Sequence, residues 1–199
     1  MTKTILTYIR ENITSIVKIA IIYSLSVAIG MIIFNFTSIG NSYVEIATNI
    51  FNSADVDNFN GINVIPSGIK NNMIIILTLM LSTFLTIYPL ISYSIISLKG
   101  IATGLYISSC FKIFGFFRGF EFVFLDIIVP QSFNVFGVIL CAIVFMNIYT
   151  KISKHEKIAS GDKIKFAIIF AFSLCLISFS IVFEQLISPI CINIYTNIN

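Results

Sequence analysis

The stretch that decides the fold of this chain is LKGIATGLYISSCFKIFGFFRGFEFVFLDIIVPQ, residues 98–131. A lysine and two glycines open one apolar run, and an aromatic and charged patch follows at 111–126. A proline–glutamine pair then lies in the next apolar run. Two such runs joined by a charged turn predict a helical hairpin in a membrane. We expect the rest of the chain to anchor this hairpin with further membrane helices.

The composition excludes an isolated water-soluble domain. Of the 199 residues, 57% are hydrophobic and 11% are charged, whereas soluble domains carry about 25% charged residues. The apolar runs are continuous, which favours helices because membrane-spanning strands alternate polar and apolar residues. A net charge of +3 is too small to indicate nucleic-acid binding. We therefore expect an all-α integral membrane protein with a single membrane domain, residues 1–199.

Five transmembrane helices are expected, at about 16–36, 73–97, 99–114, 127–149 and 166–187. Residues 2–15 predict either a short helix on the membrane surface or an extension of the first span. The polar segment 37–72 predicts one short amphipathic helix at about 43–53. Tyr88-Pro89 would kink the second span, residues 115–126 would form an interfacial turn or a shallow re-entrant helix, and Pro189 would end the last helix.

The basic residues determine the expected orientation, because lysine and arginine collect on the cytoplasmic side of membrane proteins. With the N-terminus inside, the inner side holds Lys3, Arg10, Lys18, Lys99 and the lysines of 151–165, and the outer side holds Lys70, Lys112 and Arg118. We expect the N-terminus inside and the C-terminus outside, in a bacterial cytoplasmic membrane. The segment 37–72 is then extracytoplasmic, and 150–165 is a cytoplasmic basic loop.

Small and polar residues at two places are candidates for helix packing. On one face of the third span, Gly100, Gly104 and Ser108 recur every four residues, and such a ridge lets another helix backbone come close. The second set lies near the start of the fourth span and consists of Pro130, Gln131 and Asn134. Its amide side chains predict hydrogen bonds to another helix.

Five charged residues are expected near the outer ends of the third, fourth and fifth spans: Lys112, Arg118, Glu121, Asp126 and Glu184. A charge at the centre of a membrane helix costs about 2.5–3.5 kcal/mol, so such residues usually pair or face a cavity. Two interpretations are open. The five form an outer polar cluster that shapes a partner or ligand site, or their side chains reach the lipid headgroups.

The sequence contains no catalytic constellation. The single histidine, His155, lies in the basic loop, and the four cysteines show neither a CxxC motif nor metal-ligand spacing. P-loop, GxGxxG and HExxH motifs are missing. An intramembrane carboxylate pair would be needed for catalysis, and Asp126 with Glu184 is a poor match for one. We expect a protein that is not an enzyme and uses no cofactor or metal.

Four short patches follow one another along nearly the whole chain: Ile9-Arg10-Glu11-Asn12, Lys70-Asn71-Asn72, Lys99-Gly100 and Gly104 joined to Pro130-Gln131, and Glu184 with Ser188-Pro189. In the order and spacing of these patches the chain resembles the stage II sporulation protein M family of bacterial integral membrane proteins. The family has more glycine along the third span and an asparagine after the Pro-Gln pair, where this chain has Ser132.

The resemblance implies two alternative functions. The family's namesake acts with two membrane-anchored peptidoglycan-cleaving partners during engulfment of the forespore, which implies a scaffold that recruits cell-wall remodelling enzymes. A related branch lies beside circular bacteriocin genes, which implies a membrane subunit for bacteriocin production, export or immunity that works with a separate ATPase. The expected partners are membrane lipid and membrane-anchored wall hydrolases or other membrane proteins. A homo-oligomer is a further alternative, and no nucleic acid is expected.

Overall fold

The computed structural model describes residues 2–38, 40–45, 48 and 65–196. Its helices are α1 (Thr2–Glu11), α2 (Ile13–Phe36), α4 (Ile65–Ser82), α5 (Tyr88–Phe114), α6 (Phe116–Phe122), the π-helix η3 (Val123–Ile128), α7 (Val129–Ser153) and α8 (Ser160–Thr196). The described residues contain no strand. The predicted all-α class is therefore confirmed.

In the part of the chain that the structure describes, four helical segments are long and apolar enough to cross a membrane. They are Ile13–Phe36, Tyr88–Phe114, Val129–Ser153 and Ser160–Glu184. The helix α4, Ile65–Ser82, has 18 residues; at 1.5 Å per residue it measures about 27 Å, against a hydrocarbon core of about 30 Å. The described residues therefore contain four long apolar helices and the somewhat shorter α4, which suits the protein to a membrane. The number of five spans stays a prediction.

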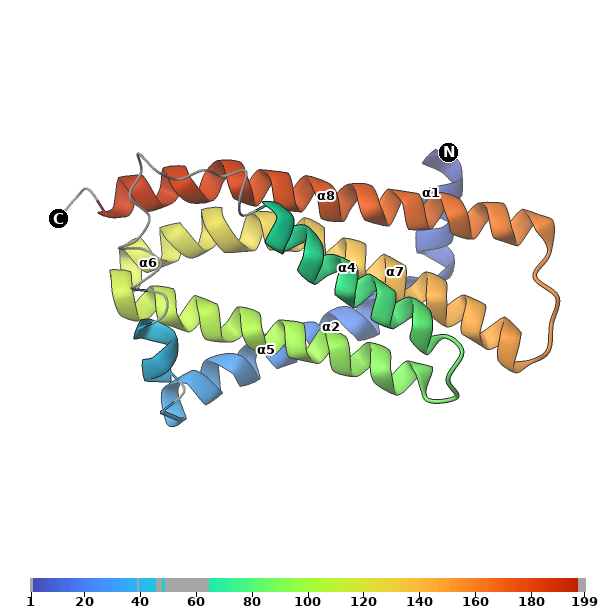
Figure 1. The fold of residues 1–199 in the computed structure, drawn as a ribbon, viewed down its shortest axis with the longest axis horizontal. Coiled ribbons are helices and arrows are strands. Elements are labelled where there is room, and N and C mark those ends of the chain that lie inside the picture. Colours follow the sequence, from blue (N-terminus) through green and yellow to red (C-terminus); the bar gives the residue numbers. More distant parts are fainter. Residues whose placement is uncertain (1, 39, 46–47, 49–64, 197–199) are drawn as a thin grey trace.

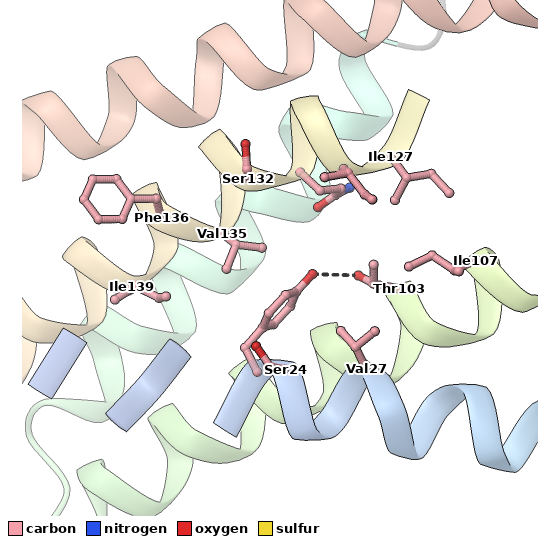
Figure 2. Close-up of a pocket in the computed structure, with 12 residues that line it drawn as sticks. Ser24, Val27, Thr103, Ile107, Ile127, Ser132, Val135, Phe136 and Ile139 are labelled. Atoms are coloured by element: carbon pink, nitrogen blue, oxygen red, sulfur yellow. Dashed lines mark hydrogen bonds between the residues drawn. The ribbon is translucent and has the colours of Figure 1, made fainter. Parts of the chain in front are cut away.

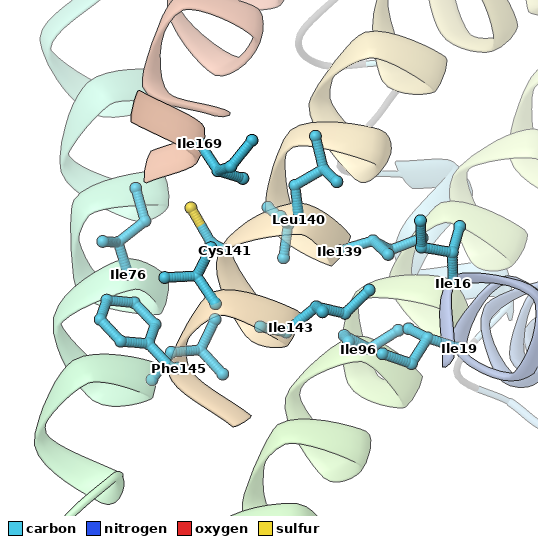
Figure 3. Packing of buried hydrophobic residues seen from close by; sticks show 14 of the residues in the cluster. Ile16, Ile19, Ile76, Ile96, Ile139, Leu140, Cys141, Ile143, Phe145 and Ile169 are labelled. Atoms are coloured by element: carbon cyan, nitrogen blue, oxygen red, sulfur yellow. The ribbon is translucent and has the colours of Figure 1, made fainter. Parts of the chain in front are cut away.

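The long helices run side by side, and α7 lies at the centre of their packing (Figure 1). Every residue of α7 from Gly137 to Phe145 is buried. Isoleucines of four other helices pack around this segment (Figure 3): Ile19 of α2, Ile76 of α4, Ile96 of α5 and Ile169 of α8. A helix that is apolar on all sides is typical of the middle of a bundle, and α7 has that place here.

The first helix, α1, is separate from α2 and crosses the direction of the long helices (Figure 1). The chain bends at Asn12, whose side-chain Nδ2 donates a hydrogen bond to the carbonyl of Tyr8 at 2.9 Å. Tyr8 is buried, and its hydroxyl accepts a hydrogen bond from Nδ2 of Asn147 at 2.9 Å. Of the two alternatives for residues 2–15, the structure thus shows a short separate helix, which is held against α7.

The turn between α4 and α5 occupies residues 83–87, so the predicted boundary between spans 73–97 and 99–114 is wrong. Pro89 does not kink a span. It lies in the first turn of α5, where a missing backbone N–H costs no helical hydrogen bond. The Tyr88 hydroxyl donates to the carbonyl of Ala142, and the Tyr149 hydroxyl donates to that of Thr86, both at 2.8 Å. These two bonds attach the turn to α7.

Residues 116–126 are helical, which agrees with the helical one of the two alternatives; whether this helix is re-entrant stays a prediction. Gly115 has a φ of 75°, which places it in the left-handed region that favours glycine. The chain therefore turns sharply after α5, and α6 and η3 lead without interruption into α7. Glycine at this corner is what allows the helical hairpin to close.

Two further predictions concern the polar segment and the last helix. Residues 40–45 are helical, but most of the predicted helix at 43–53, and much of the segment 37–72, lie outside the described residues. The predicted end of the last helix at Pro189 is wrong, because α8 continues to Thr196. A proline is tolerated in a membrane helix when neighbouring groups satisfy the freed carbonyl.

Candidate functional site within the helix bundle

Lys99 lies near the middle of α5, and not in the loop where the sequence placed it. At 1.5 Å per residue, its backbone is about 17 Å from the first residue of α5 and about 23 Å from the last. When α5 crosses a membrane, Lys99 is therefore at bilayer depth. Ionisable residues at that depth usually pair with another charge or face a cavity, and they mark candidate functional sites.

A polar cavity of about 250 Å³ lies at Lys99, between α5, η3, α7 and α8. Its lining consists of Lys99, Ala102, Thr103, Tyr106, Ile127, Gln131 and Glu184. The Lys99 ammonium group and the Glu184 carboxylate interact electrostatically. The structure thus brings a cation of α5 and an anion of α8 to one cavity inside the bundle.

Gln131 is a further polar residue in the lining of this cavity. Its side-chain Oε1 is buried and has no hydrogen-bond partner among the described residues. Leaving such an acceptor unsatisfied costs about 1–3 kcal/mol. Three residues further along α7, the Oδ1 atom of Asn134 is also buried and has no hydrogen-bond partner within the described part of the chain. The start of α7 therefore presents acceptors that a hydrogen-bond donor would satisfy.

A larger, mostly apolar cavity of about 510 Å³ adjoins the polar one, between α2, α5 and α7 (Figure 2). Figure 2 shows Val27 of α2, Ile107 of α5 and Val135 of α7 around it. Thr103, Ile127 and Gln131 line both cavities. Together, the two cavities form an amphipathic site: one part carries both charges and the other carries apolar side chains.

Hydrogen bonds hold the wall between the two cavities in place. The Tyr23 hydroxyl of α2 donates to Oγ1 of Thr103 at 3.1 Å (Figure 2). Oγ1 of Thr103 in turn donates to the backbone carbonyl of Lys99 at 3.0 Å. The Thr103 hydroxyl thus accepts one hydrogen bond and donates another within the protein. Through these bonds it links the backbone at Lys99 to α2.

The glycines of α5 hold this helix directly against α2. A Cβ atom on Gly104 would lie 2.1 Å from the carbonyl oxygen of Val27, and one on Gly100 would lie 2.7 Å from Cβ of Ser26. These are the residues whose spacing predicted close packing. The sequence reading missed their counterpart Gly30 in α2, where a Cβ atom would lie 2.3 Å from a carbonyl oxygen of α5.

The remaining predicted packing residues lie inside the bundle. Ser108, the third member of the glycine face, is buried, and so is Asn134. The carbonyl of Pro130 accepts a hydrogen bond from Oγ of Ser180 at 2.7 Å. This bond joins the start of α7 to α8, close to the polar cavity.

The structure distributes the five predicted charged residues over more than one place. Glu184 lines the polar cavity together with Lys99. Nζ of Lys112 donates a hydrogen bond to Oδ1 of Asn41 at 2.8 Å, near the end of α5. The side chain of Asp126 lies outside the described residues.

Arg118 and Glu121 are exposed on α6, next to large apolar side chains. Phe116, Phe117 and Phe120 are 72%, 82% and 55% exposed on the same short helix. An apolar patch flanked by charges is typical of a surface that contacts a partner or the membrane interface. We call these five residues the α6 surface.

Among the described residues, no group of His, Cys, Asp and Glu is arranged to hold a metal ion. Cys110 and Cys141 are buried, and Cys175 is exposed. The sequence reading missed Lys99, Thr103 and Tyr106 as site residues. A signal that could have found them is the succession of Ser82-Thr83 and Pro89, which is typical of a helix start. A helix that begins there contains Lys99 in its interior.

No family model matches the chain, and neither does any curated protein or any solved structure. Its function is therefore inferred from its residues and their geometry.

Proposed function

We propose that this protein is a non-enzymatic, multi-pass membrane scaffold that recruits cell-wall remodelling partners, as in sporulation engulfment. The resemblance to the stage II sporulation protein M family suggests the role, and the α6 surface is the observation that supports it. Three exposed phenylalanines with Arg118 and Glu121 lie at one end of the bundle. Aromatic residues and arginine are the side chains most enriched where proteins bind one another.

The proposed orientation places the α6 surface on the extracytoplasmic side of a bacterial cytoplasmic membrane. In Figure 1 the N-terminus and the connection between α7 and α8 lie towards one end of the bundle, and α6 and the C-terminal part of α8 lie at the other. The connection carries Lys154 and Lys157, and the adjoining helix ends carry Lys151 and Lys165. The positive-inside rule favours this basic end as cytoplasmic.

Labelling of single cysteines tests the orientation. In a background without the native cysteines, we expect Phe117→Cys to react with a membrane-impermeant maleimide in intact cells, because its side chain is 82% exposed at the α6 end. Ser153→Cys, at the basic end, should react only after the membrane is permeabilised. Labelling of Ser153→Cys alone in intact cells would show that the orientation is inverted.

Co-purification tests the recruitment. We expect Arg118→Ala with Glu121→Ala to reduce co-purification of membrane-anchored peptidoglycan hydrolases from the same cell, because these side chains are exposed on the α6 surface. Lys154→Ala with Lys157→Ala is the matched control, since it removes two exposed charges from the opposite end. Wild-type recruitment by the α6 variant, with loss of recruitment by the lysine variant, contradicts the scaffold proposal.

A second candidate function is a membrane subunit for the production, export or immunity of a circular bacteriocin, working with a separate ATPase. The cavity that holds Lys99 and Glu184 favours it, because charged residues at bilayer depth commonly mark substrate pathways. The ATPase would bind the basic end, so the lysine variant of the preceding experiment would then lose its partner. The same pair of variants thus separates the two candidates.

A further inference from the structure

We propose that the two adjoining cavities bind one phospholipid with a zwitterionic, primary-ammonium headgroup. The headgroup occupies the polar cavity, with its phosphate near Lys99 and its ammonium near Glu184, and part of an acyl chain occupies the apolar cavity. This binding site is independent of the scaffold proposal, which rests on the α6 surface.

The charges of the polar cavity select a headgroup that carries both signs. The cavity holds the cation Lys99 and the anion Glu184, which already interact with each other. An anionic headgroup would place a second negative charge beside Glu184, and a cationic one would place a second positive charge beside Lys99. Away from water an uncompensated charge is costly, so a headgroup with one charge of each sign fits best.

The acceptors of the cavity select a primary ammonium group over a trimethylated one. Glu184 and Gln131 both line the cavity, and the buried Oε1 atom of Gln131 has no hydrogen-bond partner in the part of the chain that the structure describes. A primary ammonium group donates three hydrogen bonds, whereas a trimethylammonium group donates none. Only the former satisfies the Gln131 oxygen.

The apolar cavity indicates that the occupant is a lipid and not a small soluble zwitterion. It adjoins the polar cavity through their shared residues Thr103, Ile127 and Gln131, and side chains such as Val135 and Phe136 line it. A soluble amino acid or headgroup would leave this apolar space unused. The membrane surrounds the protein with amphiphiles, so even a site of modest affinity would be filled.

Native mass spectrometry of the full-length protein in detergent tests the proposal. The probes are phosphatidylethanolamine, phosphatidylcholine and phosphatidylglycerol with identical acyl chains. We expect about a tenfold preference for phosphatidylethanolamine over each of the others, since one hydrogen bond to a charged group supplies that ratio. The double variant Lys99→Met with Glu184→Gln should lose the preference, and Lys112→Met, whose side chain is outside the cavities, should keep it.

A separate variant keeps the test decisive if the double variant fails to fold. Gln131→Leu removes only the unpartnered acceptor, and it should reduce the discrimination against phosphatidylcholine while preserving that against phosphatidylglycerol. Equal binding of the three lipids by the wild-type protein would overturn the proposal. So would an undiminished preference in a folded double variant, or full competition by soluble glycerophosphoethanolamine, which would assign the site to a headgroup without a chain.

Discussion

Gly104→Leu is expected to prevent assembly of the helix bundle. Even a single Cβ atom at this position would lie 2.1 Å from the backbone carbonyl oxygen of Val27 and 3.0 Å from the backbone nitrogen of Met31. A backbone carbonyl cannot swing aside as a flexible side chain can, so α5 would have to move away from α2. Overpacking usually costs about 1–3 kcal/mol. We expect Gly104→Ala to fall in that range and Gly104→Leu to exceed it.

The yield of monodisperse protein in detergent and its thermal unfolding temperature measure this effect. Ser94→Leu is the matched control, because it adds a leucine to an exposed position of the same helix; we expect near wild-type yield and unfolding temperature. If Gly104→Leu and Ser94→Leu extract and unfold alike, α2 and α5 do not approach as closely as the structure shows.

Lys99→Met and Glu184→Gln are each expected to destabilise the protein, because each single change removes one of two opposite, half-buried charges that interact in the same cavity. The loss should stay below the cost of breaking a fully buried ion pair, which is about 3–5 kcal/mol. The double variant should be closer to wild type than either single variant, since replacing both interacting charges leaves neither of them uncompensated. The interaction between the two positions should therefore be large and favourable in a double-mutant cycle.

Unfolding free energies of the wild type, both single variants and the double variant measure that interaction. Lys112→Met is the control for loss of a lysine at an exposed position of α5, and we expect it to change stability by less than about 0.5 kcal/mol. Additive effects of Lys99→Met and Glu184→Gln would mean that the two charges do not depend on each other for stability.

The prediction of a membrane protein followed from composition alone, for a physical reason. A chain with 57% hydrophobic and 11% charged residues has too few polar side chains to cover a soluble surface, whatever its tertiary structure. Periodicity within one helix was equally informative. The spacing of Gly100 and Gly104 placed both on one face, and the structure puts that face against α2.

The positions of the turns could not be predicted from composition or periodicity. Residues 82–87 are uncharged and three of the six are apolar, so no charge separates α4 from α5, and Lys99 was the nearest charge to mark a loop. The structure turns at 83–87, and two hydrogen bonds attach this turn to α7: the Tyr88 hydroxyl donates to the carbonyl of Ala142, and the Tyr149 hydroxyl donates to the carbonyl of Thr86. Pro189 led to the opposite error. The last helix was predicted to end there, whereas α8 continues through it.

Sequence by itself determined that the chain is an all-helical membrane protein, that α5 has a face for close packing, and that basic residues collect around 151–165. Only the tertiary structure decided that Lys99 and Glu184 share a cavity with Gln131. Charge pairing between two helices depends on their relative depth and rotation. Depth depends on where each helix begins, and rotation depends on how both pack against α7, so no local pattern in either helix contains that information.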